Sequence, residues 1–203
     1  AEYLQNELQQ DDQKEIVATI KQAGESILSI VNTLLNSEYI KKEAFRLNAA
    51  PTNIAELTEE VINLVQPFIM LKNQHLKVDI QQQLEWKVDA EKWKQIVGNL
   101  LTNASKFTAI GGHIAIKAGP DEEGKHLQLD VSDMGQGMNE ELLSRIFSGN
   151  KGILRPGTEG ESSSGIGMPT IKRYVDLHGG TITIRSKPDH GTRVIVTIPN
   201  QTA

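Results

Sequence analysis

The amino-terminal quarter of the chain carries hydrophobic residues at the spacing of a packed helix. Between Asp11 and Asn36 they recur at alternating intervals of four and three residues, which is a heptad seam. The seam consists of Ile16, Ile20, Ala23, Ile27, Ile30 and Leu34. Flanking apolar positions widen the stripe and favour a helical bundle, although an ordinary amphipathic helix packed on its own domain has the same periodicity.

The pattern of the chain changes at Pro51. Asn53 followed by Glu56 forms an Asn-x-x-Glu capping box, which predicts that a helix begins here and runs to about Leu71. We therefore expect a helical region over residues 1–50 and a larger domain over residues 51–203.

Helical and strand periods then alternate irregularly along this larger domain. Alternating LKVDI predicts a strand over residues 76–80, and Asp89 is a suitable N-cap for a helix over residues 90–107. Further strands are expected from His113 and His126, over 181–186 and over 192–199, with helices over 139–147 and 166–177. Because these elements do not follow βαβ alternation, we expect an α+β sandwich with an antiparallel-rich sheet.

Charge and composition narrow the classes of function. The chain has 203 residues, with 21 Lys and Arg against 26 Asp and Glu, and its net charge of −5 argues against a nucleic-acid partner. The sequence has no run of about 18 apolar residues, so we expect no membrane contact by this chain. It has no cysteine, which excludes disulfides and thiolate sites. An anionic ligand would need backbone donors or a few well-placed cations.

Asn99, Asn103 and Lys106 share one face of the helix predicted over residues 90–107. The apolar stripe of that helix lies about a third of a turn away and is expected to face the core; it comprises Trp93, Ile96, Leu100, Ala104 and Phe107. Two carboxamides and an ammonium group suit a hydrated Mg²⁺ ion that carries phosphates. A solvated helix face has the same pattern.

Two glycine-containing segments could bring backbone close to a ligand. Asp133-Met-Gly-Gln-Gly137 follows a predicted strand, so its carboxylate could accept a hydrogen bond from an amino group, although a tight turn needs the same residues. The segment from Gly157 to Gly167 ends where a helix begins, and helix N-termini offer N–H donors to phosphate. It is neither a Walker A loop nor a dinucleotide fingerprint, and a flexible surface loop is the alternative.

The order of these segments resembles the sensor histidine kinase catalytic domain, a member of the GHKL ATPase superfamily. WKQIVGNLLTNASKFT, DMGQGM, RIFSGN and GTEGESSSGIGMPTIKRYVDLHGGTITIRS are similar to its N, G1, F and G2 boxes. The resemblance covers about residues 53–199. Residues 20–62 resemble the second helix of the kinase dimerisation hairpin and its link to the catalytic domain.

The resemblance implies a Bergerat-type two-layer sandwich, with helices on one face of a mixed, largely antiparallel sheet and a long helix before it. It implies that Asn103 chelates Mg²⁺, that Asn99 helps to hold the metal or its water, and that Lys106 reaches the phosphates of ATP. Asp133 would accept a hydrogen bond from adenine. The other nucleotide-binding residues would be Gly135, Gly137, Phe147, Gly165, Ile166, Gly167 and Met168.

The implied reaction moves the γ-phosphate of ATP to a histidine on a dimerisation hairpin. No histidine precedes His75, so the phosphoacceptor is expected outside this chain, and the chain alone is not expected to autophosphorylate. The implied partners are that hairpin, a downstream response regulator and a second kinase subunit in a homodimer. The implied location is the cytoplasm, with the parent kinase either free or anchored in the plasma membrane.

The sequence departs from the family pattern in two boxes. The G2 box has Ser163 where a glycine is usual, and the F box keeps Phe147 without the second aromatic residue. These departures favour the alternative of a catalytically degenerate GHKL nucleotide-binding module that regulates a partner by dimerisation. A serine-directed GHKL kinase or an ATPase is a third hypothesis, which the hairpin-like amino-terminal region disfavours. Arg155 is a candidate for the γ-phosphate, although an exposed loop position is the preferred interpretation.

Overall fold

A computed structural model describes residues 46–148, 155–161, 163 and 165–200 of the chain. The chain divides into two compact units, residues 1–45 and residues 46–203. The predicted heptad helix falls in the first unit and lies outside the described residues, so it stays a prediction.

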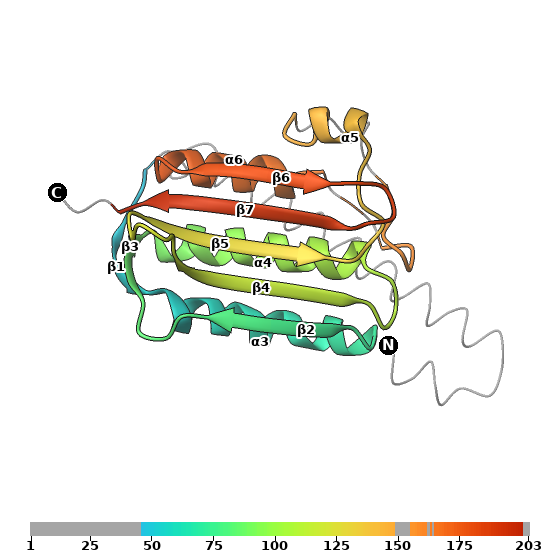
Figure 1. The fold of residues 1–203 in the computed structure, drawn as a ribbon, viewed down its shortest axis with the longest axis horizontal. Coiled ribbons are helices and arrows are strands. Elements are labelled where there is room, and N and C mark those ends of the chain that lie inside the picture. Colours follow the sequence, from blue (N-terminus) through green and yellow to red (C-terminus); the bar gives the residue numbers. More distant parts are fainter. Residues whose placement is uncertain (1–45, 149–154, 162, 164, 201–203) are drawn as a thin grey trace. The chain divides into compact units, whose positions relative to one another are not determined.

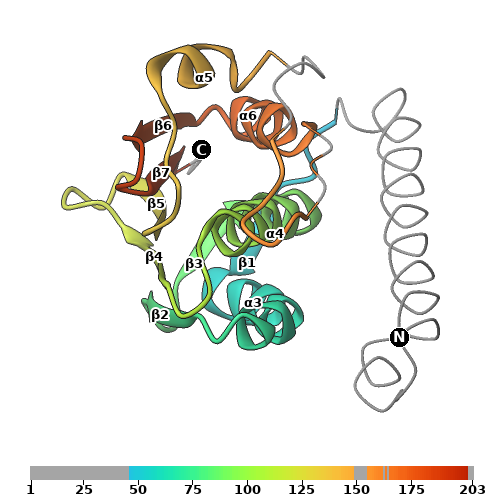
Figure 2. The ribbon, with the colours of Figure 1, turned by 90° about the vertical axis from the view of Figure 1, so that its right-hand side faces the viewer.

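The second unit is a two-layer sandwich of helices on a five-stranded sheet (Figures 1 and 2). The strand order is β2-β4-β5-β7-β6, in which β2 and β4 are parallel and all other neighbours are antiparallel. The strands are β2 His75–Ile80, β4 His113–Pro120, β5 His126–Asp133, β6 Thr181–Ser186 and β7 Thr192–Pro199. The predicted α+β class, with a largely antiparallel sheet and helices on one face, is confirmed.

The helices begin where the capping residues predict. In α3, Ile54–Leu71, the Asn53 side chain accepts hydrogen bonds from the N–H groups of Ala55 and Glu56. In α4, Ala90–Phe107, the Asp89 side chain accepts from the N–H of Lys92. The other helices within the described residues are α5 Glu140–Arg145, which ends two residues before the predicted Phe147, and α6 Gly167–Leu177.

A second, two-stranded sheet was not predicted from the sequence. β1, Ala50–Asn53, pairs antiparallel with β3, Glu85–Val88. Both strands have only four residues, and Pro51 weakens the strand signal of β1. Their pairing joins segments more than 30 residues apart, so no local pattern could reveal it.

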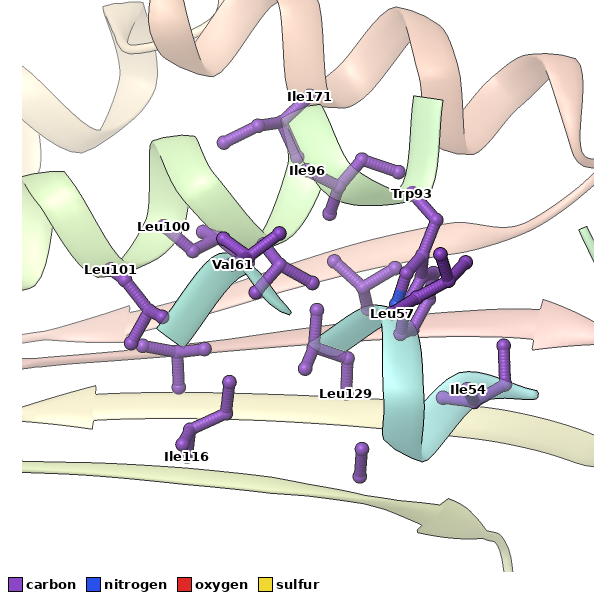
Figure 3. Close-up of a cluster of buried hydrophobic side chains, with 14 of the residues drawn as sticks. Ile54, Leu57, Val61, Trp93, Ile96, Leu100, Leu101, Ile116, Leu129 and Ile171 are labelled. Atoms are coloured by element: carbon purple, nitrogen blue, oxygen red, sulfur yellow. The ribbon is translucent and has the colours of Figure 1, made fainter. Parts of the chain in front are cut away.

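The core fills the space between the helices and one face of the large sheet. Figure 3 shows side chains from α3, α4, α6 and the strands gathering around Trp93, which is 0% exposed. Its indole N–H donates to the Thr58 hydroxyl at 3.1 Å, so the largest buried side chain has its polar atom satisfied. Burial of this set, at roughly 25 cal/mol per Å² of apolar surface, is the main force that holds the two layers together.

None of the described helices covers the opposite face of the large sheet (Figure 2). Along β4 and β5, residues alternate between the core and this open face, where polar and charged side chains predominate. Within the described part of the chain, no helix has the length and apolar content needed to cross a bilayer.

Candidate functional site

The two asparagines predicted from α4 lie beside the start of α6. The Asn99 amide donates through Nδ2 to its own helix, at the Gln95 carbonyl, at 2.8 Å. This bond leaves Oδ1 pointing away, and a Cβ placed on Gly167 would lie 3.3 Å from Asn99 Oδ1 and 3.7 Å from Asn103 Nδ2. Residues 64 and 68 positions apart are therefore in close approach, and a Cβ at position 167 would crowd the Asn99 amide and contact the Asn103 amide.

The end of α6 that faces these amides carries a partial positive charge. Its N-cap is Ile166, and no side chain caps this end with a hydrogen bond. Gly165 has φ +70°, a left-handed conformation that favours glycine, and it turns the chain into the helix. Met168, one residue into the helix, packs partly buried against the core. N–H groups at such a helix start suit a phosphate.

Lys106, at the carboxyl end of α4, extends toward the segment that precedes α6. Its ammonium donates to the Ser163 hydroxyl at 2.7 Å and lies 5.5 Å from the centre of the Phe107 ring. Burial lowers the pKa of Lys106, and the nearby charge of Glu161 partly opposes this shift. The residue that replaces the usual glycine of the G2 box is thus in direct contact with the predicted phosphate-binding lysine.

Asp133 is the last residue of β5, and one oxygen of its carboxylate is hydrogen-bonded to the backbone. Oδ1 accepts hydrogen bonds from the N–H groups of Gly135 at 2.9 Å and Thr192 at 3.2 Å. Among the described residues, none donates a hydrogen bond to Oδ2. Burial raises the pKa of this carboxyl, and the two backbone bonds and Arg155 oppose the rise. Asp133 is therefore oriented by backbone and has a free acceptor for an amino group.

The glycines after Asp133 are required by close backbone packing. A Cβ on Gly135 would lie 2.2 Å from the Phe107 carbonyl oxygen, and one on Gly137, whose φ is +60°, would lie 1.9 Å from the Lys187 carbonyl oxygen. The Gln136 N–H donates to the Phe107 carbonyl at 3.0 Å. The turn thus joins the end of α4 to the connection between β6 and β7, and both glycines hold Asp133 in place.

Phe107 and Arg155 differ from the sequence expectations. Phe107 was expected in the core but is half-buried, because it lies at the last turn of α4 beyond the edge of the packed layers. The Arg155 guanidinium lies 4.6 Å from the centre of its ring. Arg155 is therefore half-buried as well, and its preferred interpretation as an exposed loop residue is wrong.

Lys72 is a positioning residue that the sequence analysis missed. Its ammonium donates to the carbonyl of Ser105 at 3.0 Å and to the side chains of Thr158 at 2.6 Å and Glu161 at 2.9 Å. It therefore ties the 157–161 segment to the end of α4, where its charge also offsets the negative end of the helix dipole. A single lysine after an apolar helix has no sequence signal that distinguishes it from a solvated one.

Gln74 completes this attachment. Its Nε2 donates to the carbonyls of Ser105 at 2.9 Å and Thr108 at 2.8 Å, and its Oε1 accepts from the Ser105 hydroxyl at 2.7 Å. The end of α4 that carries Lys106 is thus fixed by buried polar contacts from the segment that follows α3.

Phe147 lies just after α5 and is half-buried. Figure 1 shows α5 beside α6 and β6, at the edge of the domain away from α3. Its predicted contact with nucleotide stays a prediction, whereas the other predicted positions on α4, β5 and α6 are gathered at one end of the domain.

Comparisons with known proteins agree with this arrangement. Residues 88–202 match the family described as histidine kinase-, DNA gyrase B- and HSP90-like ATPase. The chain is 32% identical over 95% of its length to an uncharacterized sensor-like histidine kinase of Rhizobium meliloti, of which it covers 37%.

Two solved structures have a similar fold and 25% sequence identity. Full-length ShkA in complex with AMPPNP matches 98% of this chain with a TM-score of 0.73, and the match covers 41% of that protein. Histidine kinase ThkA in complex with the response regulator protein TrrA matches 94% of this chain with a TM-score of 0.70, and the match covers 52% of that chain. The chain thus spans about half or less of the lengths of these three relatives. It belongs to the histidine kinase-, DNA gyrase B- and HSP90-like ATPase family, as an ATP-binding catalytic domain of the sensor histidine kinase type.

Proposed function

We propose that this chain binds Mg²⁺-ATP and supplies the kinase activity of a two-component sensor kinase. The γ-phosphate would be transferred to a histidine on a dimerisation hairpin. The observation that carries the proposal is the approach of Asn99 and Asn103 to Gly167, at the same end of the domain as the open carboxylate oxygen of Asp133.

Asp133 would recognise the base of the nucleotide. Its open Oδ2 can accept a hydrogen bond from the exocyclic amino group of adenine, while Oδ1 stays bonded to the backbone. Gly135 keeps the turn close to α4 and Gly137 keeps it close to the connection between β6 and β7, so that Asp133 is presented at a fixed angle. Guanine has a carbonyl at the matching position, so this acceptor favours adenine.

The phosphates would lie between α4 and the start of α6. The N–H groups of the first turn of α6 and the Lys106 ammonium provide donors and positive charge. Phosphoryl transfer depends mainly on positioning and charge neutralisation, so this set suits the reaction. Arg155 is a further cation close to Asp133, and we propose that it contacts nucleotide only after moving off the Phe107 ring.

The donor set fits a magnesium ion that is bound together with nucleotide. Among the described residues, no three His, Asp or Glu side chains gather into a metal-binding group. The carboxamide oxygens of Asn99 and Asn103 are neutral ligands, which suit an ion that keeps waters and binds phosphates. When bound, Mg²⁺ supplies charge neutralisation at the phosphates.

The acceptor histidine and the response regulator would lie outside these 203 residues. None of the five histidines precedes His75, and all lie within residues 51–203. Residues 1–50 would then form part of the dimerisation hairpin in a homodimeric kinase. ThkA, solved with a response regulator, supports a response regulator as the downstream partner.

An equilibrium titration with AMPPNP, with and without Mg²⁺, tests the nucleotide site. We expect Mg²⁺-sensitive binding that weakens at least about tenfold in Asp133→Ala, because one hydrogen bond to a charged group is lost. Asp79→Ala, which removes an exposed carboxylate on β2, is the matched control and should bind normally. Normal affinity in Asp133→Ala would remove Asp133 from the site.

The phosphotransfer step needs the intact parent kinase. With ATP and Mg²⁺ it should form an acid-labile, base-stable phosphoprotein, as phosphohistidine does. The Ser163 hydroxyl bound to Lys106 is the observation that favours the degenerate-module alternative, because it engages the phosphate-binding lysine. Nucleotide binding without phosphotransfer to any supplied hairpin would support that alternative.

A further inference from the structure

A pocket of about 680 Å³ lies on the open face of the large sheet, at the end where β5 finishes and β2 and β4 begin. In Figure 1 this is the right-hand end of the strands, in front of the helices. Seven basic side chains line it: His75, Lys77, His113, Arg185, Lys187, His190 and Arg193. The proposed nucleotide site uses none of these basic side chains, although its Asp133 also lines the pocket.

The sheet register places small residues between two basic walls, one formed by Lys77 and the other by Arg193 and Arg185. Lys77 of β2 pairs with Ala115 of β4, which pairs with Ser132 of β5. Ser132 pairs with Arg193 of β7, and Arg193 pairs with Arg185 of β6. These five residues form one row across the sheet, so Ala115 and Ser132 make a low floor. Lys77 and Arg193 are three strand spacings apart, about 14 Å.

Histidines add to both walls at the rim of the pocket. His75 and His113 are register partners, and their ring centres are 4.9 Å apart. Lys187 and His190 lie on the connection between β6 and β7. The His190 ring bonds through Nδ1 to the Pro188 carbonyl at 2.8 Å, which leaves Nε2 for another contact. Each wall therefore combines Lys or Arg side chains with histidine rings.

Few carboxylates oppose this positive charge, and Asp133 is the one acidic residue among the described residues that line the pocket. Asp130 forms a bidentate pair with Arg193, and Asp79 pairs with Lys117. Within the described residues, Lys77, Arg185 and Lys187 form no ion pair. Such a concentration of unneutralised cations is unexpected in a chain whose net charge is −5.

We propose that this pocket binds a small organic anion with at least two phosphate groups. Two separated basic walls match two anionic groups, and Lys and Arg side chains bind phosphate strongly. The volume is in the range typical of small-molecule sites. Met134, which is 73% exposed and lines the same pocket, offers an apolar contact for the organic part. An acidic protein segment is the competing occupant.

The histidines provide a local readout for a test with linear tripolyphosphate. His75, His113 and His190 line the pocket, whereas His126 and the buried His178 do not and serve as internal references. We expect saturable NMR shifts of the first three ring resonances when ¹³C-histidine-labelled full chain is titrated without Mg²⁺. Orthophosphate, which cannot reach both walls, should bind at least about tenfold more weakly.

Exposed cations on the sheet allow matched variants. Lys77→Ala and Arg185→Ala should each weaken tripolyphosphate binding about tenfold, because each removes a charge-assisted contact. Lys125→Ala, which removes an exposed lysine at the other end of the sheet, should bind like the unchanged chain. Lys106→Ala should leave the three shifts unchanged even if it abolishes AMPPNP binding, which separates this site from the nucleotide site.

Three results would overturn the proposal. One is the absence of saturable histidine shifts at about 10 mM tripolyphosphate. Another is equal weakening in Lys77→Ala and Lys125→Ala, which would indicate diffuse charge attraction. The third is tight binding of an Asp- and Glu-rich peptide to the same histidines with no response to tripolyphosphate, which would identify a protein partner instead.

Discussion

The Asn103 side chain faces the start of α6 and forms no hydrogen bond with the side chain or backbone of another described residue. We therefore expect this side chain to serve the proposed nucleotide site more than the fold. We expect Asn103→Asp to change the Mg²⁺ dependence of AMPPNP binding about tenfold, because a carboxylate binds the metal but repels the phosphates. The thermal midpoint should change little.

Thr102→Asp is the matched control for this variant, because Thr102 is the exposed neighbour on α4. Titrations at several Mg²⁺ concentrations should show the unchanged dependence in Thr102→Asp. The same unchanged dependence in Asn103→Asp would remove Asn103 from the metal site.

Lys72 contacts both the end of α4 and the 157–161 segment. Lys72→Met leaves Glu161 without its cation and leaves carbonyls at the end of α4 unbonded. We expect the free energy of unfolding, measured with urea, to fall by about 2 kcal/mol. AMPPNP binding should weaken as well, since the 157–161 segment loses its attachment to α4.

Glu161→Gln separates the charge of this contact from the rest of it. The Lys72 ammonium keeps the Ser105 carbonyl and the Thr158 hydroxyl, so the loss of stability should be smaller than in Lys72→Met. Equal stability of Lys72→Met and the unchanged chain would show that the contacts of the Lys72 ammonium do not stabilise the fold.

At the scale of elements, α6 is joined to the start of α4 through His178. This side chain is 0% exposed; its Nε2 accepts from the Asp89 N–H at 3.0 Å and its Nδ1 donates to the Tyr174 carbonyl at 2.7 Å. Burial lowers the pKa of His178 below the ordinary value of 6.5, although the bond to Tyr174 opposes the shift. The imidazole therefore stays neutral in the folded domain.

This linkage predicts a loss of stability in mild acid. The unfolded chain takes up a proton at His178 as pH falls through about 6.5, whereas the folded state does not until lower pH. Stability contributed by the neutral ring is therefore full above about pH 6.5 and declines below it. Urea unfolding between pH 5 and pH 8 would measure the slope of the unfolding free energy against pH. In mild acid this slope should correspond to the uptake of about one proton per molecule on unfolding.

His178→Gln, which cannot titrate, should have less of this slope, and His126→Gln should retain it. A slope that is the same in all three proteins would contradict the role of His178.

Asp89 acts at lower pH: burial opposes its ionisation, but hydrogen bonds from Lys92 and Asn48 lower its pKa below 3.8. Its contribution is therefore present above that pH and is lost only in stronger acid.

At the scale of the whole molecule, the unit over residues 46–203 has its own sheet, helices and core. We expect a chain of residues 46–203 to fold and to bind AMPPNP within about twofold of the full chain, because a domain with its own core can fold alone. Unfolding curves and titration would check this. Loss of the fold would overturn the division of the chain.

A shorter chain of residues 54–203 is the informative comparison. It lacks β1, the Asn53 cap of α3 and the Asn48 N–H that donates to Asp89 at 2.9 Å. The cap alone is worth about 1 kcal/mol, so this chain should be clearly less stable than residues 46–203. Equal stability would show that β1 and these contacts do not support the domain.

The sequence by itself determined most elements of the domain and the family to which it belongs. The bounds of α4, β6 and β7 agree with the predicted ranges, because capping residues and hydrophobic alternation act within a few positions of the chain. The motif order also predicted Asn103, Lys106 and Asp133 as nucleotide-binding residues, since each motif is contiguous.

Only the tertiary structure decided how distant segments meet. It paired β1 with β3, brought Gly167 to Asn99, buried Lys72 against Glu161, and aligned Lys77 with Arg185 across five strands. It also left Phe107, expected in the core, half-buried beneath the Arg155 guanidinium. Each of these contacts joins residues that are far apart in sequence, and sheet register and loop packing, rather than local periodicity, set which side chains become neighbours.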